Sequence, residues 1–374
     1  MNSQSPQQSK PAFRRNLLEK YLRQQIQLRQ DHFDEPLGTE LQLAEIYHLS
    51  RNTVRKVLQQ LQNEGLLIRK TGFGTFIVPP EKRPAGKVRL RKILLATNWP
   101  ANDFYVQRLV SGILEYAYPR NTRLDIVQYG TLSAGTMIAN YRALKYDAVI
   151  HDRPAHDQNS LIKEMAAAGI PQVVINRSIA DVPSLFVDHK NAVQQVVNFF
   201  SGLGLRRICF VDMPRPEPLF LQRQTFFSQE LARQGIKDPE EYVFLWHQDK
   251  NNARDCFNHY LEKHPEIEAV FAVRPVVSDV LEVLKTRELT VPEDISLIML
   301  DEDSRNPEFQ SISVFREPIQ QLGSLAAEVV FSCNSDKGSA EVPIFLPGEL
   351  IVRSSCRYPF GSLRKIELKK RIMA

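Results

Sequence analysis

The chain has 374 residues, of which 43% are hydrophobic and 24% charged. This composition excludes a disordered, collagenous or disulfide-scaffold protein and predicts two or three globular domains. The four cysteines include no CxxC pair, so we expect reduced thiols rather than a zinc site. The Ser- and Gln-rich start lacks a signal-peptide core, and no apolar run approaches the ~18 residues of a membrane span, which predicts a cytoplasmic protein.

Charge is divided unevenly along the sequence. Residues 1–92 carry 17 Lys or Arg and 8 Asp or Glu, residues 93–360 carry 26 and 34, and residues 361–374 carry 5 and 1. A basic module joined to an acidic body indicates that the first part meets a polyanion and the second does not. Charge alone leaves nucleic acid and an anionic membrane both open.

Three helices are predicted in the basic part. Apolar residues near helical spacing predict the first over residues 13–28. Thr39 and Gln42 form a capping box that opens a short second helix. Ser50 caps the third helix, and Gly65 stands where a left-handed C-terminal cap belongs. The apolar stripe of the third helix consists of Val54, Val57, Leu58 and Leu61.

Two short strands follow, over residues 66–70 and 75–78, joined by a turn that contains two glycines. Three helices and a hairpin describe a winged helix-turn-helix, whose third helix enters the DNA major groove while the wing lies along the backbone or minor groove. Arginine near the start of that helix can fork onto guanine, and Asn and Thr can reach other edges or phosphates. The alternative is a small helical domain with a solvated charged face.

Five motifs keep their order and spacing in this region: LGTE at 37–40, LAE at 43–45, SRNTVR at 50–55, EGL at 64–66 and GFGTF at 72–76. Together they resemble the GntR-type winged-helix DNA-binding domain. The resemblance implies DNA contacts from Ser50, Arg51, Asn52, Thr53, Arg55, Lys56, Thr71 and Gly72. Leu41 replaces the family's usual arginine and Gly38 its proline. A contact is therefore expected to be missing or to come from Lys56 or Lys70.

The remaining sequence predicts an α/β fold with doubly wound parallel sheets. Residues 79–92 are Pro-rich, basic and aperiodic, as in a linker. Short β-rich runs then alternate with helical stretches such as 191–200 and 276–284, which indicates parallel sheets covered on both faces. The roughly 270 residues after the linker are long for one such sheet and predict two similar lobes. The predicted strands are 93–97, 124–129, 147–151, 172–176, 208–212, 269–273 and 296–300. The predicted organisation is a disordered tail 1–12, a winged helix-turn-helix 13–78, the linker, a two-lobed effector-binding and dimerisation domain 93–360 and a basic tail 361–374.

Two facing lobes predict a cleft at the carboxyl ends of their strands, which closes around a ligand by hinge motion. The residues just after the strands form a polar, mixed-charge set suited to hydroxyls or a carboxylate. Each one alone is as well explained by a helix cap or a surface ion pair. The set consists of Asn98, Asn176, Arg177, Asp188, Asp212, Arg274 and Asp301.

Distinctive runs include NDFY at 102–105, VPEDIS at 291–296, LDE at 300–302 and REP at 316–318. Residues 93–358 thereby resemble the LacI/GalR-type ligand-sensing domain, itself similar to periplasmic sugar-binding proteins. The resemblance implies that Asp188, Arg223 and Asp301 hold the effector, with Asn98 and Phe104 on the loop after the first strand.

The sequence differs from the LacI/GalR-type pattern directly after the strand predicted at 269–273. Arg274-Pro275 replaces the usual Asn-Asp pair there. One hypothesis is that Arg274 binds an anionic effector, such as a sugar acid or sugar phosphate. The other is that Arg274 pairs with Asp301 or Asp188 and leaves a neutral sugar pocket.

Other chemistry is less favoured by the sequence. His151, Asp152, His156 and Asp157 suggest a metal cluster, but the Pro-broken segment favours surface residues. Trp99 and Trp246 are candidates to stack on a sugar, although packing in the core or on a lobe surface is favoured. No cofactor motif appears.

The two resemblances together predict a ligand-responsive transcription regulator that binds an inverted-repeat operator as a homodimer. Repression relieved by a sugar or sugar-derived effector is the expected sign. The alternatives are a solute-binding transport protein, which would need a secretory signal, and a sugar-processing enzyme, which would need an assignable acid/base pair.

Overall fold

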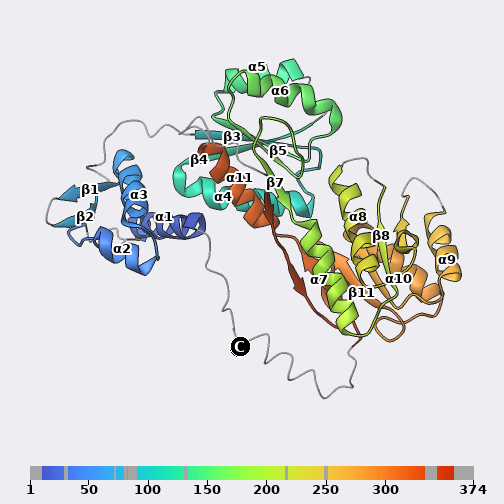
Figure 1. The fold of residues 1–374 in the computed structure, drawn as a ribbon. Helices are drawn as coiled ribbons and strands as arrows, with labels where there is room; N and C mark the ends of the chain where they lie inside the picture. The colour runs from blue at the N-terminus through green and yellow to red at the C-terminus, as the bar shows by residue number, and fades with distance from the viewer. Residues whose placement is uncertain are drawn as a thin grey trace. The chain divides into compact units, whose positions relative to one another are not determined.

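The computed structural model describes residues 11–28, 33–70, 73–79, 82, 91–129, 134–214, 218–247, 252–332 and 343–357. They fall into two units: the N-terminal unit comprises Met1–Arg91 with Ala117–Arg123, and the C-terminal unit comprises Lys92–Tyr116 with Leu124–Ala374 (Figure 1). The predicted basic tail, most of the linker and the wing residues Thr71 and Gly72 lie outside the described residues.

The N-terminal unit has the predicted winged helix-turn-helix architecture. Its elements are α1 (Pro11–Leu28), α2 (Glu40–Ile46), α3 (Arg51–Asn63), β1 (Leu67–Lys70) and β2 (Gly74–Ile77). The two strands pair antiparallel. The capping box of Thr39 and Gln42 is present, the Ser50 hydroxyl accepts a hydrogen bond from the Thr53 N–H, and Gly65 has a φ of 71°. All three predicted caps are therefore confirmed.

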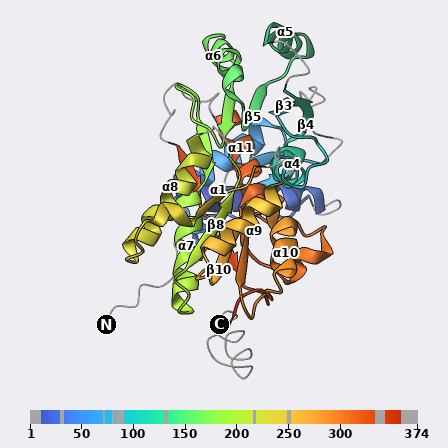
Figure 2. The ribbon, with the colours of Figure 1, turned by 90° about the vertical axis from the view of Figure 1, so that its right-hand side faces the viewer.

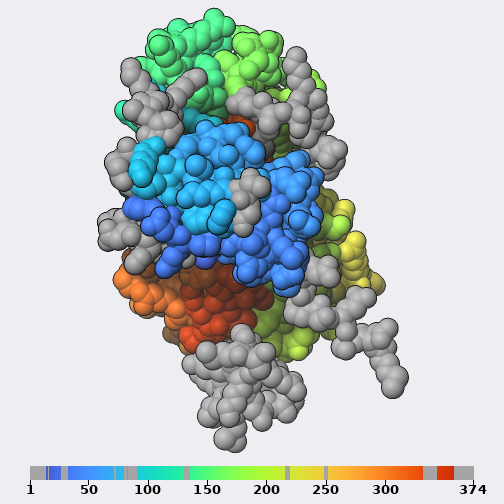
Figure 3. Space-filling model, turned by 90° about the vertical axis from the view of Figure 1, so that its left-hand side faces the viewer, coloured from blue at the N-terminus to red at the C-terminus, as the bar shows by residue number. Residues whose placement is uncertain are grey.

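An aliphatic core holds the N-terminal unit together, beneath the surface that Figure 3 shows in blue. The predicted stripe of α3 is fully buried against Leu18 and Leu22 of α1. The buried Arg23 links α1 to α3 by donating hydrogen bonds to Glu19 at 2.9 Å and Glu64 at 2.8 Å. Gly38 has a φ of 119°, a conformation closed to the proline that the family usually carries there.

The first lobe of the C-terminal unit is built on a six-stranded sheet of order β13-β7-β6-β5-β3-β4. Its strands are β3 (Arg91–Thr97), β4 (Thr122–Gln128), β5 (Ala148–Asp152), β6 (Gln172–Ile175), β7 (Ser184–Val187) and β13 (Ile344–Leu346). Helices α5 (Ala134–Leu144) and α6 (Asn159–Ala167) cover one face, and α4 (Phe104–Ala117) and α11 (Ile319–Ser332) cover the other (Figures 1 and 2).

The second lobe has the sheet order β14-β12-β11-β10-β8-β9, parallel in its described central pairs. Its strands are β8 (Ile208–Asp212), β9 (Val243–Leu245), β10 (Ala269–Val273), β11 (Ser296–Leu300), β12 (Ser313–Arg316) and β14 (Glu349–Ile351). Helices α7 (His189–Gly202) and α8 (Pro218–Arg233) pack on one face, and α9 (Ala253–Lys263) and α10 (Val277–Thr286) on the other.

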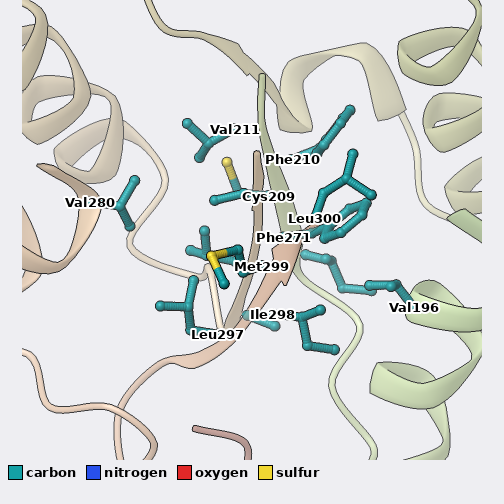
Figure 4. Packing of buried hydrophobic residues seen from close by; sticks show 14 of the residues in the cluster. Val196, Cys209, Phe210, Val211, Phe271, Val280, Leu297, Ile298, Met299 and Leu300 are labelled. Carbon is teal, nitrogen blue, oxygen red and sulfur yellow. The ribbon is translucent and has the colours of Figure 1, made fainter. Parts of the chain in front are cut away.

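The buried strands of this lobe are apolar on both faces. Figure 4 shows Cys209 and Val211 turned toward Val280 of α10, whereas Phe210 and Leu300 lie on the side of Val196 of α7. Successive side chains of a strand point to opposite faces, so a sheet covered on both sides needs a continuous apolar run. That is why these strands could be predicted from the sequence.

Three connections join the lobes, since the chain crosses after β7, again between β12 and α11, and again between β13 and β14. The seven predicted strands are present, and the fold class is confirmed. The sequence did not predict β7, β9, β12, β13 and β14, which are only three or four residues long. No helix among the described residues is long and apolar enough to cross a membrane.

Candidate functional site

The outward face of α3 is polar and cationic. Arg51, Asn52 and Lys56 are exposed, opposite the buried apolar stripe of the same helix. Within the described part of the chain, no hydrogen bond or ion pair holds the side chain of Arg51 or Lys56. Unpaired cations at the start of an exposed helix suit phosphate oxygens and guanine edges.

Two other predicted DNA contacts are held by neighbours within the unit. Arg55 donates to both carboxylate oxygens of Glu40, at 3.2 and 3.1 Å, and Arg69 pairs with the same carboxylate. Thr53 lies 2.8 Å from the Ser50 hydroxyl, inside the cap of α3. The charge of Arg55 is therefore partly compensated by Glu40 before any ligand binds.

The wing exposes an aromatic side chain that the sequence patterns did not single out. Phe73 is 75% exposed, and its N–H donates to the Lys70 carbonyl at 2.9 Å. The available signal was its position between two glycines of a predicted turn, where a side chain has nothing to pack against. The hydrogen bond from Leu37 N–H to Thr75 O, at 2.8 Å, ties the wing to the loop before α2.

A cleft lies between the two lobes of the C-terminal unit. Most of its polar and aromatic lining follows the carboxyl ends of strands, as expected for open parallel sheets. The first lobe contributes Trp99, Asp103, Tyr105 and Arg153, and the second contributes Met213, Phe220, Arg223, Val273, Arg274, Pro275, Leu300 and Asp301. Glu317, on the connection from β12 to α11, completes the lining.

Arg223, Arg274 and Asp301 were predicted at the effector site, and the structure brings all three to this cleft. Three further predicted residues do not line it. The amide of Asn98 donates to the Arg153 carbonyl at 3.0 Å. Phe104 lies beneath the guanidinium groups of Arg108 and Arg305.

The third misplaced residue, Asp188, caps helix α7 by accepting a hydrogen bond from the Asn191 N–H at 2.9 Å. Its carboxylate is thereby engaged in holding the helix start. Two of the four lining residues of the first lobe, Trp99 and Tyr105, each stand one position after a predicted residue. Neighbouring side chains point in different directions, so an offset of one residue exchanges a lining position for a packed one.

Most charges of the cleft are paired across short distances. Arg223 donates to the fully buried Asp212 through Nε, at 2.8 Å, and through Nη2. Arg108 of α4 pairs with Asp301 at 2.6 Å, which joins the two lobes.

Arg274 has longer contacts than the other paired arginines. It lies 3.4 Å from Asp303 and 3.7 Å from Asp103, and among the described residues it forms no ion pair with Asp301 or Asp188. Arg274 is therefore paired with carboxylates, as one of the two hypotheses expects, but the partners are Asp303 and Asp103 instead of Asp301 or Asp188.

The carboxyl groups of the cleft titrate differently from one another. Burial and the charge of Glu317 raise the pKa of Asp301 to about 6, against the opposing charge of Arg108. Burial also opposes ionisation of Glu317, but its hydrogen bond with His189, at 2.9 Å, and nearby arginine charges hold its pKa below the usual value. As the pH falls, Asp301 therefore takes up a proton before Glu317 does.

The cleft also corrects the expectation for one of the two tryptophans. Trp99, expected to pack in the core or on a lobe surface, lines the cleft. Trp246 does pack in the core, where it is 2% exposed.

His151 and Asp152 are fully buried at the end of β5, not on the surface. His151 lies between Tyr129 and Gln172, and burial lowers its pKa to about 4, so it is a neutral core residue. Among the described residues no group of three potential metal ligands occurs.

Comparisons with known proteins agree with both parts of the chain. Residues 16–77 match the model of bacterial regulatory proteins of the GntR family. Residues 197–356 match the model of the periplasmic binding protein-like domain. The chain therefore contains a GntR-type DNA-binding domain followed by a periplasmic-binding-protein-like domain, the organisation of a transcription regulator. Its matches are regulators rather than enzymes.

Two relatives of this regulator are similar over most of its length. An arabinose metabolism transcriptional repressor of Halalkalibacterium halodurans is 23% identical over 354 residues, covering 85% of this chain and 90% of the relative. The protein of the same name from Geobacillus stearothermophilus is 25% identical over 350 residues, covering 87% and 92%.

The solved structures show a similar fold. A complex of the transcriptional regulator CelR with cellobiose has a TM-score of 0.60 at 17% identity and covers 82% of this chain and 90% of that one. A LacI family regulator from Enterococcus faecium with bound ribose also has a TM-score of 0.60 at 17% identity, covering 72% and 100%.

Proposed function

We propose that the regulator is a repressor that binds operator DNA as a homodimer and is released when a sugar or sugar-derived effector occupies the cleft between the lobes. The observation that carries this proposal is the cleft, which combines the aromatic rings of Trp99, Tyr105 and Phe220 with polar and charged groups from both lobes. Flat aromatic faces and convergent hydrogen-bonding groups are what a small polar ligand requires.

The effector acts by closing the lobes around itself. The three connections between the lobes can act as a hinge. A ligand that contacts both lobes makes more contacts when they are closed, so it favours the closed arrangement over the open one. A ligand shifts this equilibrium only by its difference in affinity for the two states. The coupling is reciprocal, so operator DNA weakens effector binding by the same factor.

DNA binding is assigned to the outward face of α3 and to the wing. Arg51, Asn52 and Lys56 are exposed there, and the proposal adds Phe73 as a wing contact. A homodimer doubles this surface and matches an inverted repeat, as in other helix-turn-helix proteins that read two half-sites. A repressor works where the chromosome lies, so we place it in the cytoplasm.

The test is a thermal-shift screen of the full chain with arabinose, cellobiose, ribose and their acids and phosphates, which the names of relatives and similar structures suggest. A ligand that binds only the native state at 100 times its Kd adds about 2.7 kcal/mol to stability and raises the Tm. The same ligand should release operator DNA in a mobility-shift titration. A ligand that raises the Tm but leaves DNA affinity unchanged would refute the repressor mechanism.

A further inference from the structure

Arg153 occupies an unusual backbone position at the edge of the cleft. It directly follows β5 and has a φ of 44°, in the left-handed region that residues with a side chain rarely adopt. Two hydrogen bonds fix this conformation: its N–H donates to the Ile175 carbonyl at 3.0 Å, and its carbonyl accepts from the Asn98 amide at 3.0 Å. The backbone thus directs this arginine to the cleft at a conformational cost.

The guanidinium of Arg153 lies over two aromatic rings. Its central carbon lies 3.6 Å from the centroid of the Tyr105 ring and 4.8 Å from that of Trp99. Such stacking fixes the plane of the guanidinium and leaves its N–H groups to bind an acceptor lying in that plane.

The hydrogen-bonding capacity of Arg153 is largely unused. Its Nε and Nη2 atoms are buried and have no hydrogen-bond partner among the described residues. Asp152 Oδ1 lies 3.5 Å from Nε, but the two oxygens of that carboxylate already accept hydrogen bonds from Tyr105 and Thr97. The charge of Asp152 thus balances that of Arg153, but buried N–H groups are normally hydrogen-bonded, and two nitrogens of this guanidinium remain available to a ligand.

The other cleft charges do not fill this gap. Arg223 is paired with Asp212, and Arg108 with Asp301. Asp103 and Glu317 lie within electrostatic reach of Arg153, but Asp103 pairs with Arg274, and Glu317 is hydrogen-bonded to His189. Among the described residues that line the cleft, Arg153 is therefore the arginine whose buried N–H groups have no hydrogen-bond partner.

We propose that the effector carries an anionic group, a carboxylate or a phosphate, which pairs with the guanidinium of Arg153. The inference rests on the proposed function, because it names the chemical class of the ligand in the same cleft. A planar, oriented guanidinium binds the two oxygens of such a group side by side, which a neutral hydroxyl cannot match. Asp301 and the paired side chains then receive the hydroxyl groups of the same ligand.

The experiment compares matched ligands by calorimetry with the full chain. Arabinose, arabinonic acid and arabinose 5-phosphate are titrated, followed by the same three forms of glucose. We expect one anionic form to bind at least tenfold more tightly than its neutral sugar, and the acid and phosphate arms identify which anion is preferred. Arg153→Met, which keeps the length of the side chain, should abolish the preference, while Arg153→Lys should retain part of it.

The remote Arg254→Met, which removes an exposed arginine of α9, is the matched control and should keep the full preference. Thermal unfolding of each variant establishes that it is folded before it is titrated. If neutral sugars bind as tightly as their acids and release DNA, the anion inference is overturned and the proposed function stands. If Arg153→Met is folded and keeps the preference, the anion binds elsewhere and Arg153 is not its partner. If no form of either sugar binds, both proposals fail for these sugars.

Discussion

The outward face of α3 and the cleft of the sensor both depend on arginine, but they hold it in different ways. On α3, Arg51 is exposed, and no described residue pairs with it. In the cleft, Arg223 and Arg108 are mostly buried and paired with carboxylates. A surface that meets DNA can leave its cations in water at little cost, whereas a cleft must neutralise its charges while it is empty. Arg223 and Arg108 therefore stabilise the lobes even when the cleft is empty.

The largest effect is expected from Arg223→Ala, because it removes the guanidinium from a fully buried Asp212. Breaking a buried ion pair by removing one partner costs about 3–5 kcal/mol. The free energy of unfolding of the C-terminal unit, measured by urea titration, should fall by this amount. The matched change Arg51→Ala should lower stability by less than about 0.5 kcal/mol. Equal losses from the two variants would remove the distinction between the two kinds of arginine.

A pH effect of comparable size is expected from His151. Its folded pKa of about 4 lies below the ordinary value of 6.5, so the unfolded chain binds a proton between these pH values and the native chain does not. The stability contributed by neutral His151 is thus present above pH 6.5 and is lost as the pH falls toward 4. The shift corresponds to about 3 kcal/mol.

The measurement for His151 compares the parent with His151→Gln, because Asp301 contributes with the opposite sign. The raised pKa of Asp301, about 6, makes acidification stabilising as the pH falls below 6. Taking the difference in unfolding free energy between parent and variant at pH 7 and pH 4 cancels the Asp301 contribution. A difference that does not change with pH would show that His151 is not held neutral. The described core of the winged helix contains no histidine, so its unfolding should lack this dependence.

A smaller effect is expected on DNA affinity from the exposed face of α3. Arg51→Ala should lose about 1–3 kcal/mol of binding at its cognate base and relax the preference there. Lys56→Ala should weaken binding to all sequences and reduce the salt dependence of log K by about one unit. Mobility-shift titrations at several salt concentrations separate the two outcomes. If both variants bind like the parent, the recognition face has been assigned to the wrong side of the helix.

The two units also differ in how far the sequence predicts them. In the winged helix, the caps at Thr39 and Ser50 and the stripe of α3 follow from residues three or four positions apart, and all are confirmed. Such local signals carry no information about which strand ends meet across a cleft. Family resemblance or position after a strand selected Arg223, Arg274 and Asp301, which line the cleft, whereas Asp188 caps a helix.

Arg153 shows why the rest of the cleft was missed. It directly follows a strand, the same signal that selected Arg274, but Pro154 and two histidines nearby suggested an exposed loop. Only the structure shows its left-handed backbone and its stacking on Tyr105, a residue 48 positions earlier in the sequence. Contacts between residues so far apart depend on the packing of the whole lobe.

The smallest effect separates capping from DNA contact at Ser50. Its hydroxyl accepts a hydrogen bond from the Thr53 N–H at 3.1 Å, so Ser50→Ala should cost about 1 kcal/mol of stability in the winged helix. Thr39→Ala is the matched control, because it removes the equivalent cap of α2, where the hydroxyl accepts from the Gln42 N–H at 3.2 Å. Operator affinity is then measured where both variants are fully folded. If Ser50 also contacts DNA, only Ser50→Ala binds more weakly, whereas equal affinities would limit Ser50 to holding the start of α3.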